Sequence, residues 1–96
     1  MDNIEHWRNK IDEIDKKLVE LLNERARFAD EIGKIKEQLG MEAYSPKREN
    51  EVLENIMKHN KGPLNDLALR RLFERIIDES RKLEREAMSE RKKPKQ

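Results

Sequence analysis

Residues 4–39 read IEHWRNKIDEIDKKLVELLNERARFADEIGKIKEQL and contain no proline. Their apolar positions recur in alternating steps of three and four, which is typical of one face of an α-helix; these are Ile4, Trp7, Ile11, Ile14, Leu18, Leu21, Phe28, Ile32, Ile35 and Leu39. The pattern predicts one long helix of about 36 residues, or roughly 54 Å, whereas a compact chain of this length has a radius of gyration near 12 to 13 Å. The helix must extend beyond any single-chain globule, so its exposed apolar stripe predicts a homodimer.

The composition excludes several classes of protein. Of the 96 residues, 45% are charged and 34% are hydrophobic, which leaves too little apolar material for a self-sufficient α/β enzyme. The 22 basic and 21 acidic residues nearly cancel, so the chain lacks the basic excess of a nucleic-acid-binding protein. It contains no cysteine, no signal-like start and no long apolar run, which together predict a cytoplasmic protein that does not span a membrane.

The rest of the chain predicts two further helices. Gly40 is a suitable C-terminal residue for the first helix, and Ser45-Pro46 is a suitable start for a second that ends near His59. After the break Asn60-Lys-Gly-Pro63, Asn65 or Asp66 caps a third helix. The predicted fold class is therefore all-α, with one long, one short and one medium helix per chain. We expect residues 1–88 to form the domain and residues 89–96 a basic, disordered tail or linker, in preference to a membrane-surface or nucleic-acid contact.

Polar residues occupy positions of the long helix where apolar ones are expected. Arg25 falls on the apolar stripe, and a buried guanidinium needs either an internal carboxylate or an anionic ligand. The sequence leaves three interpretations of Arg25 open: it forms an internal ion pair, it sets the helix register, or it contacts a ligand. Lys36 lies about 20° around the helix and roughly 16 Å along it, so the two residues can border one pocket. Arg8 lies roughly 26 Å before Arg25, so it could serve only the pocket of a second, antiparallel copy.

The two shorter helices add polar residues of the same kind. Arg48 and Glu49 lie in the first turn of the second helix, where the helix dipole favours Glu and opposes Arg. On the third helix, Ser80 falls on the apolar stripe and Glu84 shares its face. Each residue alone is typical of a tolerated surface position. Together with Arg25 and Lys36 they predict a polar cavity inside a helical bundle.

The predicted charge of this cavity suggests its ligand. Two glutamates oppose a surplus of basic residues, and this balance suits a small dicarboxylate; the basic residues are Arg8 of a second copy, Arg25, Lys36 and Arg48. The sequence has no Gly-rich phosphate loop, HExxH, CxxC or Ser-His-Asp set. Such a cavity is better suited to holding and polarising a ligand than to attacking it.

Five segments contain these polar residues in order: Arg8-Asn-Lys-Ile-Asp-Glu-Ile-Asp15, Leu21-Leu-Asn-Glu-Arg25, Glu31-Ile-Gly-Lys-Ile-Lys36, Tyr44-Ser-Pro-Lys-Arg-Glu49 and Ile76-Ile-Asp-Glu-Ser80. They closely resemble segments of the all-helical (AroQ) chorismate mutases, and the resemblance covers roughly residues 4–88. The resemblance implies an intertwined homodimer of three-helix chains. It also implies the pericyclic Claisen rearrangement of chorismate to prephenate, a step of the shikimate pathway towards Phe and Tyr. No cofactor, metal or covalent intermediate is implied.

The resemblance also implies roles for single residues. Arg25, and Arg8 from the second subunit, would clamp the substrate carboxylates, with Arg48 and Ser80 completing the polar wall. Lys36 would donate to the ether oxygen, and Glu49 would hold the ring hydroxyl. Ser45 stands where many members have Asp, so its contact with the hydroxyl would come from the backbone alone.

Glu84 is placed beside the ether oxygen by the same resemblance, at a position where some members have Gln. Only its protonated form can donate to that oxygen. Burial would raise its pKa and the nearby cations would lower it, and the sequence leaves this balance open. A solvent-facing Glu84 without a role in the site is the alternative.

The stretch Asn60-Lys-Gly-Pro63 and the basic end resemble the mutase domains fused to DAHP synthase. This resemblance implies a possible DAHP synthase partner, in cis or in trans. It also implies an alternative function, that of a regulatory domain that binds prephenate or chorismate and has weak mutase activity.

Overall fold

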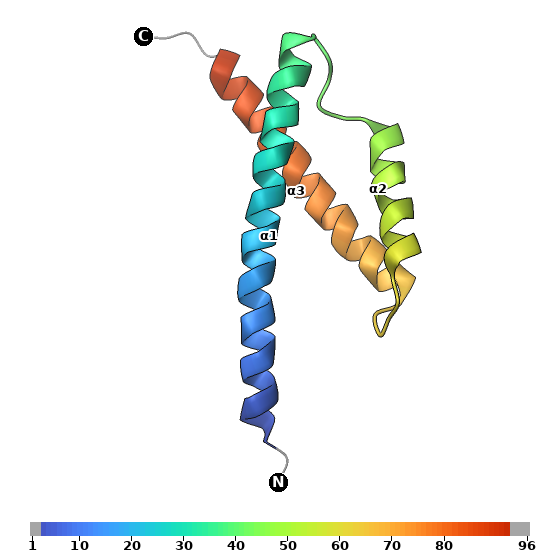
Figure 1. Cartoon of the computed structure of the whole chain (residues 1–96). Helices are drawn as coiled ribbons and strands as arrows, with labels where there is room; N and C mark the ends of the chain where they lie inside the picture. The colour runs from blue at the N-terminus through green and yellow to red at the C-terminus, as the bar shows by residue number, and fades with distance from the viewer. Residues whose placement is uncertain (1–2, 93–96) are drawn as a thin grey trace.

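The computed structural model describes residues 3–92, and over that range the protein consists of three helices. These are α1 (Ile4–Gln38), α2 (Pro46–His59) and α3 (Asp66–Lys92), as Figure 1 shows. The all-α fold class, with one long, one short and one medium helix, is confirmed. Helix α1 projects well past the other two, and the molecule measures 63 × 33 × 15 Å. Its radius of gyration of 17.4 Å exceeds the roughly 12 to 13 Å of a compact chain.

The predicted residues end and begin the helices. Gly40 has a φ of 70°, and the N–H groups of Gly40 and Met41 donate to carbonyls in the last turn of α1. This pair of bonds is a Schellman motif, which requires the left-handed backbone that glycine adopts most readily. The side chain of Ser45 caps α2, and Pro46 takes its first position. Of the two candidate caps of α3, Asn65 and Asp66, the cap is Asn65. Its side-chain oxygen accepts a backbone N–H at 2.8 Å.

The end of α3 differs from the expectation of a tail that starts at residue 89. The helix continues to Lys92, because no glycine or proline interrupts it before Pro94. An ion pair between Arg91 of α3 and Glu37 of α1 also holds this last turn. The expected tail is therefore corrected at residues 89–92, and its remainder, residues 93–96, lies outside the described residues.

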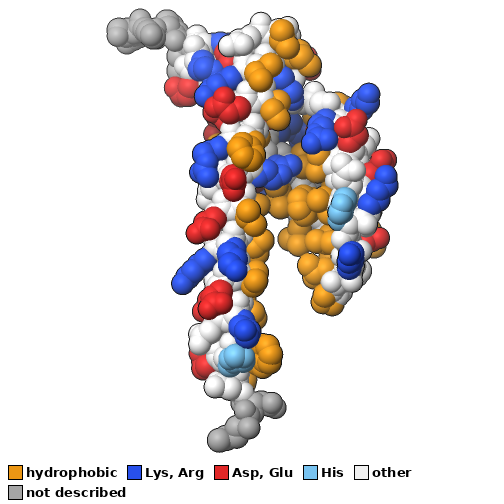
Figure 2. Space-filling view, viewed as in Figure 1, with side chains coloured by type: hydrophobic (Ala, Val, Ile, Leu, Met, Phe, Trp, Pro, Cys, Tyr) orange, Lys and Arg blue, Asp and Glu red, His pale blue; other side chains and the backbone are white. Residues whose placement is uncertain are grey.

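The chain alone has almost no core. Leu53 and Ile77 are the buried apolar side chains within residues 3–92. In contrast, the stripe along α1 is open, with Trp7 61% and Leu18 49% exposed, and Figure 2 shows it as a band of hydrophobic side chains along the helix. Burial of apolar area is the main stabilising contribution to folding, so a chain that leaves this band in water lacks most of the expected stabilisation.

None of the helices in residues 3–92 combines the length and apolar character that crossing a membrane requires.

Candidate active site

Helix α3 packs against both α1 and α2, whereas α1 and α2 do not pack directly against each other within the described residues. This arrangement leaves a cavity of about 260 Å³ bounded by all three helices and the loop before α2. Seven of the eight predicted site residues line it: Arg25, Lys36, Ser45, Arg48, Glu49, Ser80 and Glu84. The rest of the wall is mainly apolar, formed by Phe28, Ala29, Ile32, Ala43, Val52 and Ile77. The cavity can therefore exclude water from one part of a ligand while polar groups contact another.

Arg25 points from α1 toward α3. Its Nη1 donates to the hydroxyl of Ser80 at 3.0 Å, in a partly buried contact. No ion pair joins Arg25 to a carboxylate in the described part of the chain, so the internal-ion-pair alternative is wrong for this chain. Burial lowers the pKa of Arg25, and the positive charge of Arg48 lowers it further. A guanidinium in this situation favours an anion as its missing partner.

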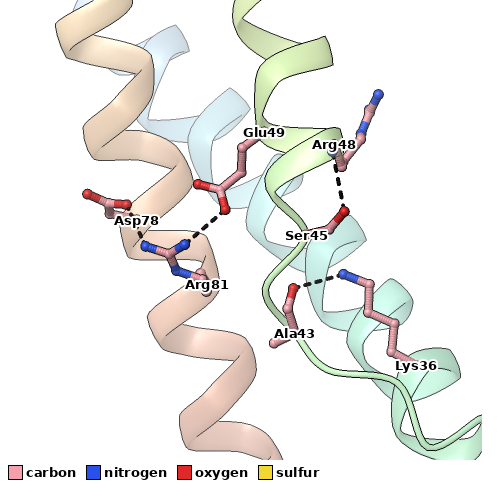
Figure 3. A network of polar contacts seen from close by, with 7 residues as sticks. All are labelled: Lys36, Ala43, Ser45, Arg48, Glu49, Asp78 and Arg81. Carbon is pink, nitrogen blue, oxygen red and sulfur yellow. Dashed lines mark hydrogen bonds and ion pairs between the residues drawn. The ribbon is translucent and has the colours of Figure 1, made fainter.

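Lys36 lies in the last turn of α1 and bridges to the loop before α2. Its Nζ donates to the carbonyl oxygen of Ala43 at 3.0 Å, as Figure 3 shows. An ammonium group has three N–H donors. One neutral carbonyl therefore fixes the direction of the side chain and leaves donors for a ligand in the cavity.

Glu84 is buried, with 9% of its surface exposed, so the solvent-facing alternative is wrong. Its stem lies against Gly33 of α1, where an added Cβ would stand 3.3 Å from Glu84 Cγ. Burial raises the pKa of Glu84; Lys36 opposes this increase and Asp30 adds to it. The net direction, which the sequence left open, is upward and favours the neutral acid.

Arg48 and Glu49 begin α2 but lie in different surroundings. Arg48 is exposed, and its Nη1 lies 3.5 Å from Glu51 Oε2, which compensates it locally. Its backbone N–H donates to the hydroxyl of Ser45 at 3.3 Å. Glu49 instead turns toward α3, where its side chain is 24% exposed.

Arg81 is a cavity residue that the sequence reasoning missed. It donates to Glu49 Oε2 at 2.9 Å and to Asp78 Oδ1 at 3.0 Å. Its guanidinium also lies over the ring of Tyr44, 4.6 Å from the centroid. One signal was available, because Arg81 lies three residues before Glu84 and so shares its helix face. The cavity therefore contains one basic residue more than predicted, and this residue, Arg81, neutralises Glu49.

Arg8 is the predicted site residue that the structure does not bring to the cavity. It lies near the start of α1, is 65% exposed and pairs with Glu5 at 2.8 Å. Along a helix, its separation from Arg25 amounts to roughly 26 Å. Any contribution from Arg8 to such a cavity requires a second copy of the chain.

The fold and cavity define an all-helical protein with a pocket in which basic side chains outnumber acidic ones. Residues 7–85 match the family model described as chorismate mutase type II. The chain belongs to this family. A chorismate mutase structure from Thermus thermophilus is similar, with a TM-score of 0.85 and 37% identity over 88% of this chain and 96% of that one. A chorismate mutase structure from Helicobacter pylori, in complex with prephenate, has a TM-score of 0.83 and 32% identity over 91% and 94% of the two chains.

Curated relatives are of two lengths. The chorismate mutase of Methanocaldococcus jannaschii is 31% identical over 91 residues, which cover 94% of this chain and 92% of that protein. The bifunctional chorismate mutase/prephenate dehydratase of Pseudomonas aeruginosa is 41% identical over 88 residues, 86% of this chain but 24% of that protein. The chain thus spans about a quarter of the length of such bifunctional relatives. The association with DAHP synthase stays a prediction.

Proposed function

We propose that this chain catalyses the rearrangement of chorismate to prephenate. The observation that carries the proposal is the convergence of Arg25, Lys36 and Glu84 on one cavity in a member of the chorismate mutase type II family. The prephenate complex of the Helicobacter relative supports the same ligand class. The alternative, a regulatory domain of DAHP synthase with weak mutase activity, is not favoured, because the donors that the reaction needs are in place.

The reaction needs positioning and electrostatic stabilisation rather than a nucleophile. The ether C–O bond of chorismate breaks while a C–C bond forms in the same step, and no atom leaves the molecule. A protein accelerates such a step by holding the flexible side chain in its reactive chair. It also stabilises the negative charge that develops on the ether oxygen.

The residues of the cavity divide these tasks. Arg25, oriented by the hydroxyl of Ser80, binds a substrate carboxylate. Lys36 and neutral Glu84 donate to the ether oxygen, and the upward pKa direction of Glu84 supports that role. Glu49 accepts from the ring hydroxyl, while Ser45 and Arg48 complete the wall beside it.

A second copy of the chain completes the site in this proposal. It would cover the exposed stripe of α1, giving the predicted intertwined homodimer, and would bring its own Arg8 to the open side of the cavity. The small core of the single chain supports this arrangement. Cytoplasmic location and association with a DAHP synthase domain, in cis or in trans, remain predictions from the sequence.

Turnover of chorismate, followed as loss of its diene absorbance, tests the proposal. We expect the purified chain to be active, and Lys36→Ala to reduce kcat/KM by about 100-fold, as for loss of one preorganised donor. Lys34→Ala is the matched control, because Lys34 lies on the same helix but pairs with Asp30 and Glu31 outside the cavity. A wild-type chain without turnover would contradict the proposed function.

A further inference from the structure

The geometry points to Arg81 as a positioning residue that holds the carboxylate of Glu49 for the substrate. This inference rests on the proposed function, in which Glu49 accepts from the ring hydroxyl. Arg81 acts through Glu49 and does not need to touch the reacting atoms.

The ion pair between Arg81 and Glu49 differs from most others in the chain. The remaining pairs in residues 3–92 mainly join residues three or four apart on the exposed side of one helix, and such pairs contribute little. Arg81–Glu49 instead joins α3 to the first turn of α2, and both side chains are 24% exposed. It therefore fixes two elements of the cavity relative to each other.

The guanidinium is itself held by three groups. Asp78 accepts from its Nη2 at 3.0 Å, Glu49 accepts from its Nη1 at 2.9 Å, and the ring of Tyr44 lies 4.6 Å from its central carbon. Figure 3 shows the two carboxylates on either side of Arg81. A planar, always charged group with these contacts has little freedom, so it imposes a direction on Glu49.

This contact leaves one oxygen of Glu49 for the substrate. Arg81 takes Oε2, and a carboxylate has a second acceptor oxygen in Oε1. Arg81 also balances the charge of Glu49 in a cavity that must admit a dicarboxylate. Without Arg81, Glu49 would be free to rotate and would repel the substrate carboxylates.

Loss of Arg81 should therefore weaken binding more than the chemical step, because the hydroxyl contact exists in both the ground state and the transition state. We expect Arg81→Met to raise KM for chorismate about 10-fold, with kcat within about 2-fold of wild type. Calorimetry should show prephenate binding weakened by a similar factor. Arg81→Lys, which keeps the charge but not the fork of donors, should recover part of this loss.

A double-mutant cycle tests whether Arg81 acts through Glu49. In a Glu49→Gln background, Arg81→Met should change KM by less than about 2-fold, since the group it positions is gone. Arg75→Met is the matched control. Arg75 lies on the same helix but outside the cavity, its side chain is 77% exposed, and it pairs with Glu79. It should leave kcat and KM unchanged.

Two results would overturn the inference. The first is a fall in kcat with unchanged KM in Arg81→Met, which indicates loss of folded sites. The second is that the effects of Arg81→Met and Glu49→Gln on KM multiply in the double variant. Where Arg81→Met does not fold, Arg81→Lys replaces it in the same cycle, with the same criterion. Active wild-type protein with multiplying effects rejects the role of Arg81 alone. A wild-type chain that neither turns over chorismate nor binds prephenate rejects the proposed function as well.

Discussion

Protonation of Glu84 should control the pH dependence of the reaction. Burial raises the pKa of this carboxyl, and only its neutral form can donate to the ether oxygen. We therefore expect kcat/KM to rise as the pH falls from about 8 toward about 5. Glu84→Gln should flatten the profile, because the amide is a donor at every pH.

The size of the effect follows from how many donors serve the oxygen. Above the pKa of Glu84, the neutral fraction falls about tenfold for each pH unit. Lys36 still donates when Glu84 is ionised, so the decline should stop once the contribution of one donor is lost, at about 100-fold. The profile should thus fall over about two pH units and then level off.

The assay is chorismate turnover at fixed ionic strength across this range, with circular dichroism at each pH to confirm that the protein stays folded. Glu86→Gln is the matched control, because Glu86 lies on the same helix with an exposed side chain. It should reproduce the wild-type profile. A wild-type profile that is flat, or that Glu84→Gln leaves unaltered, would refute the role of Glu84.

Three further predictions concern the stability and assembly of the chain. Arg25→Ala should lower kcat/KM by about 100-fold or more while Tm stays equal or rises, since a half-buried cation without a carboxylate partner is a structural cost; near-normal kinetics would reject its role. Gly33→Ala should lower kcat/KM several-fold, because the added Cβ stands 3.3 Å from Glu84 Cγ and displaces that side chain. Tm should change little, because alanine favours the helix. Unaltered kinetics would contradict this prediction. Leu18→Glu should weaken the dimer by at least about 100-fold in sedimentation, from roughly 3 kcal/mol of lost apolar burial in two copies; an active, compact monomer would contradict the shared site.

Most of the fold could be predicted because its signals are local. The apolar spacing of residues 4–39 specifies one helix. The end of that helix at Gly40 depends on a left-handed backbone that few residues favour, and the start of α2 depends on the side-chain oxygen of Ser45. The expected end of α3 was wrong because a basic composition alone does not exclude a helix. Charged residues such as Arg91 are compatible with a helix when a partner like Glu37 lies on the neighbouring element.

Most of the polar residues that line the cavity could be predicted, but Arg81 and the pairings between residues could not. Inward polar positions on α1 and α3 gave Arg25, Ser80 and Glu84 as cavity residues. A helix pattern alone does not show which residue of another helix lies opposite. The Arg81–Glu49 pair joins residues 32 apart in the chain, so no local rule reveals it. The direction of the Glu84 pKa depends on burial against neighbouring elements, which also needs three-dimensional structure.

The central claim, that this cavity converts chorismate with the help of a second copy, is tested most directly by mixing two inactive variants. Arg8→Ala and Arg25→Ala should each be nearly inactive as homodimers. After unfolding and refolding together in equal amounts, half of the dimers should be hybrids in which one of the two sites is intact, so about a quarter of wild-type activity should return. A mixture that remains as inactive as its components would contradict the claim.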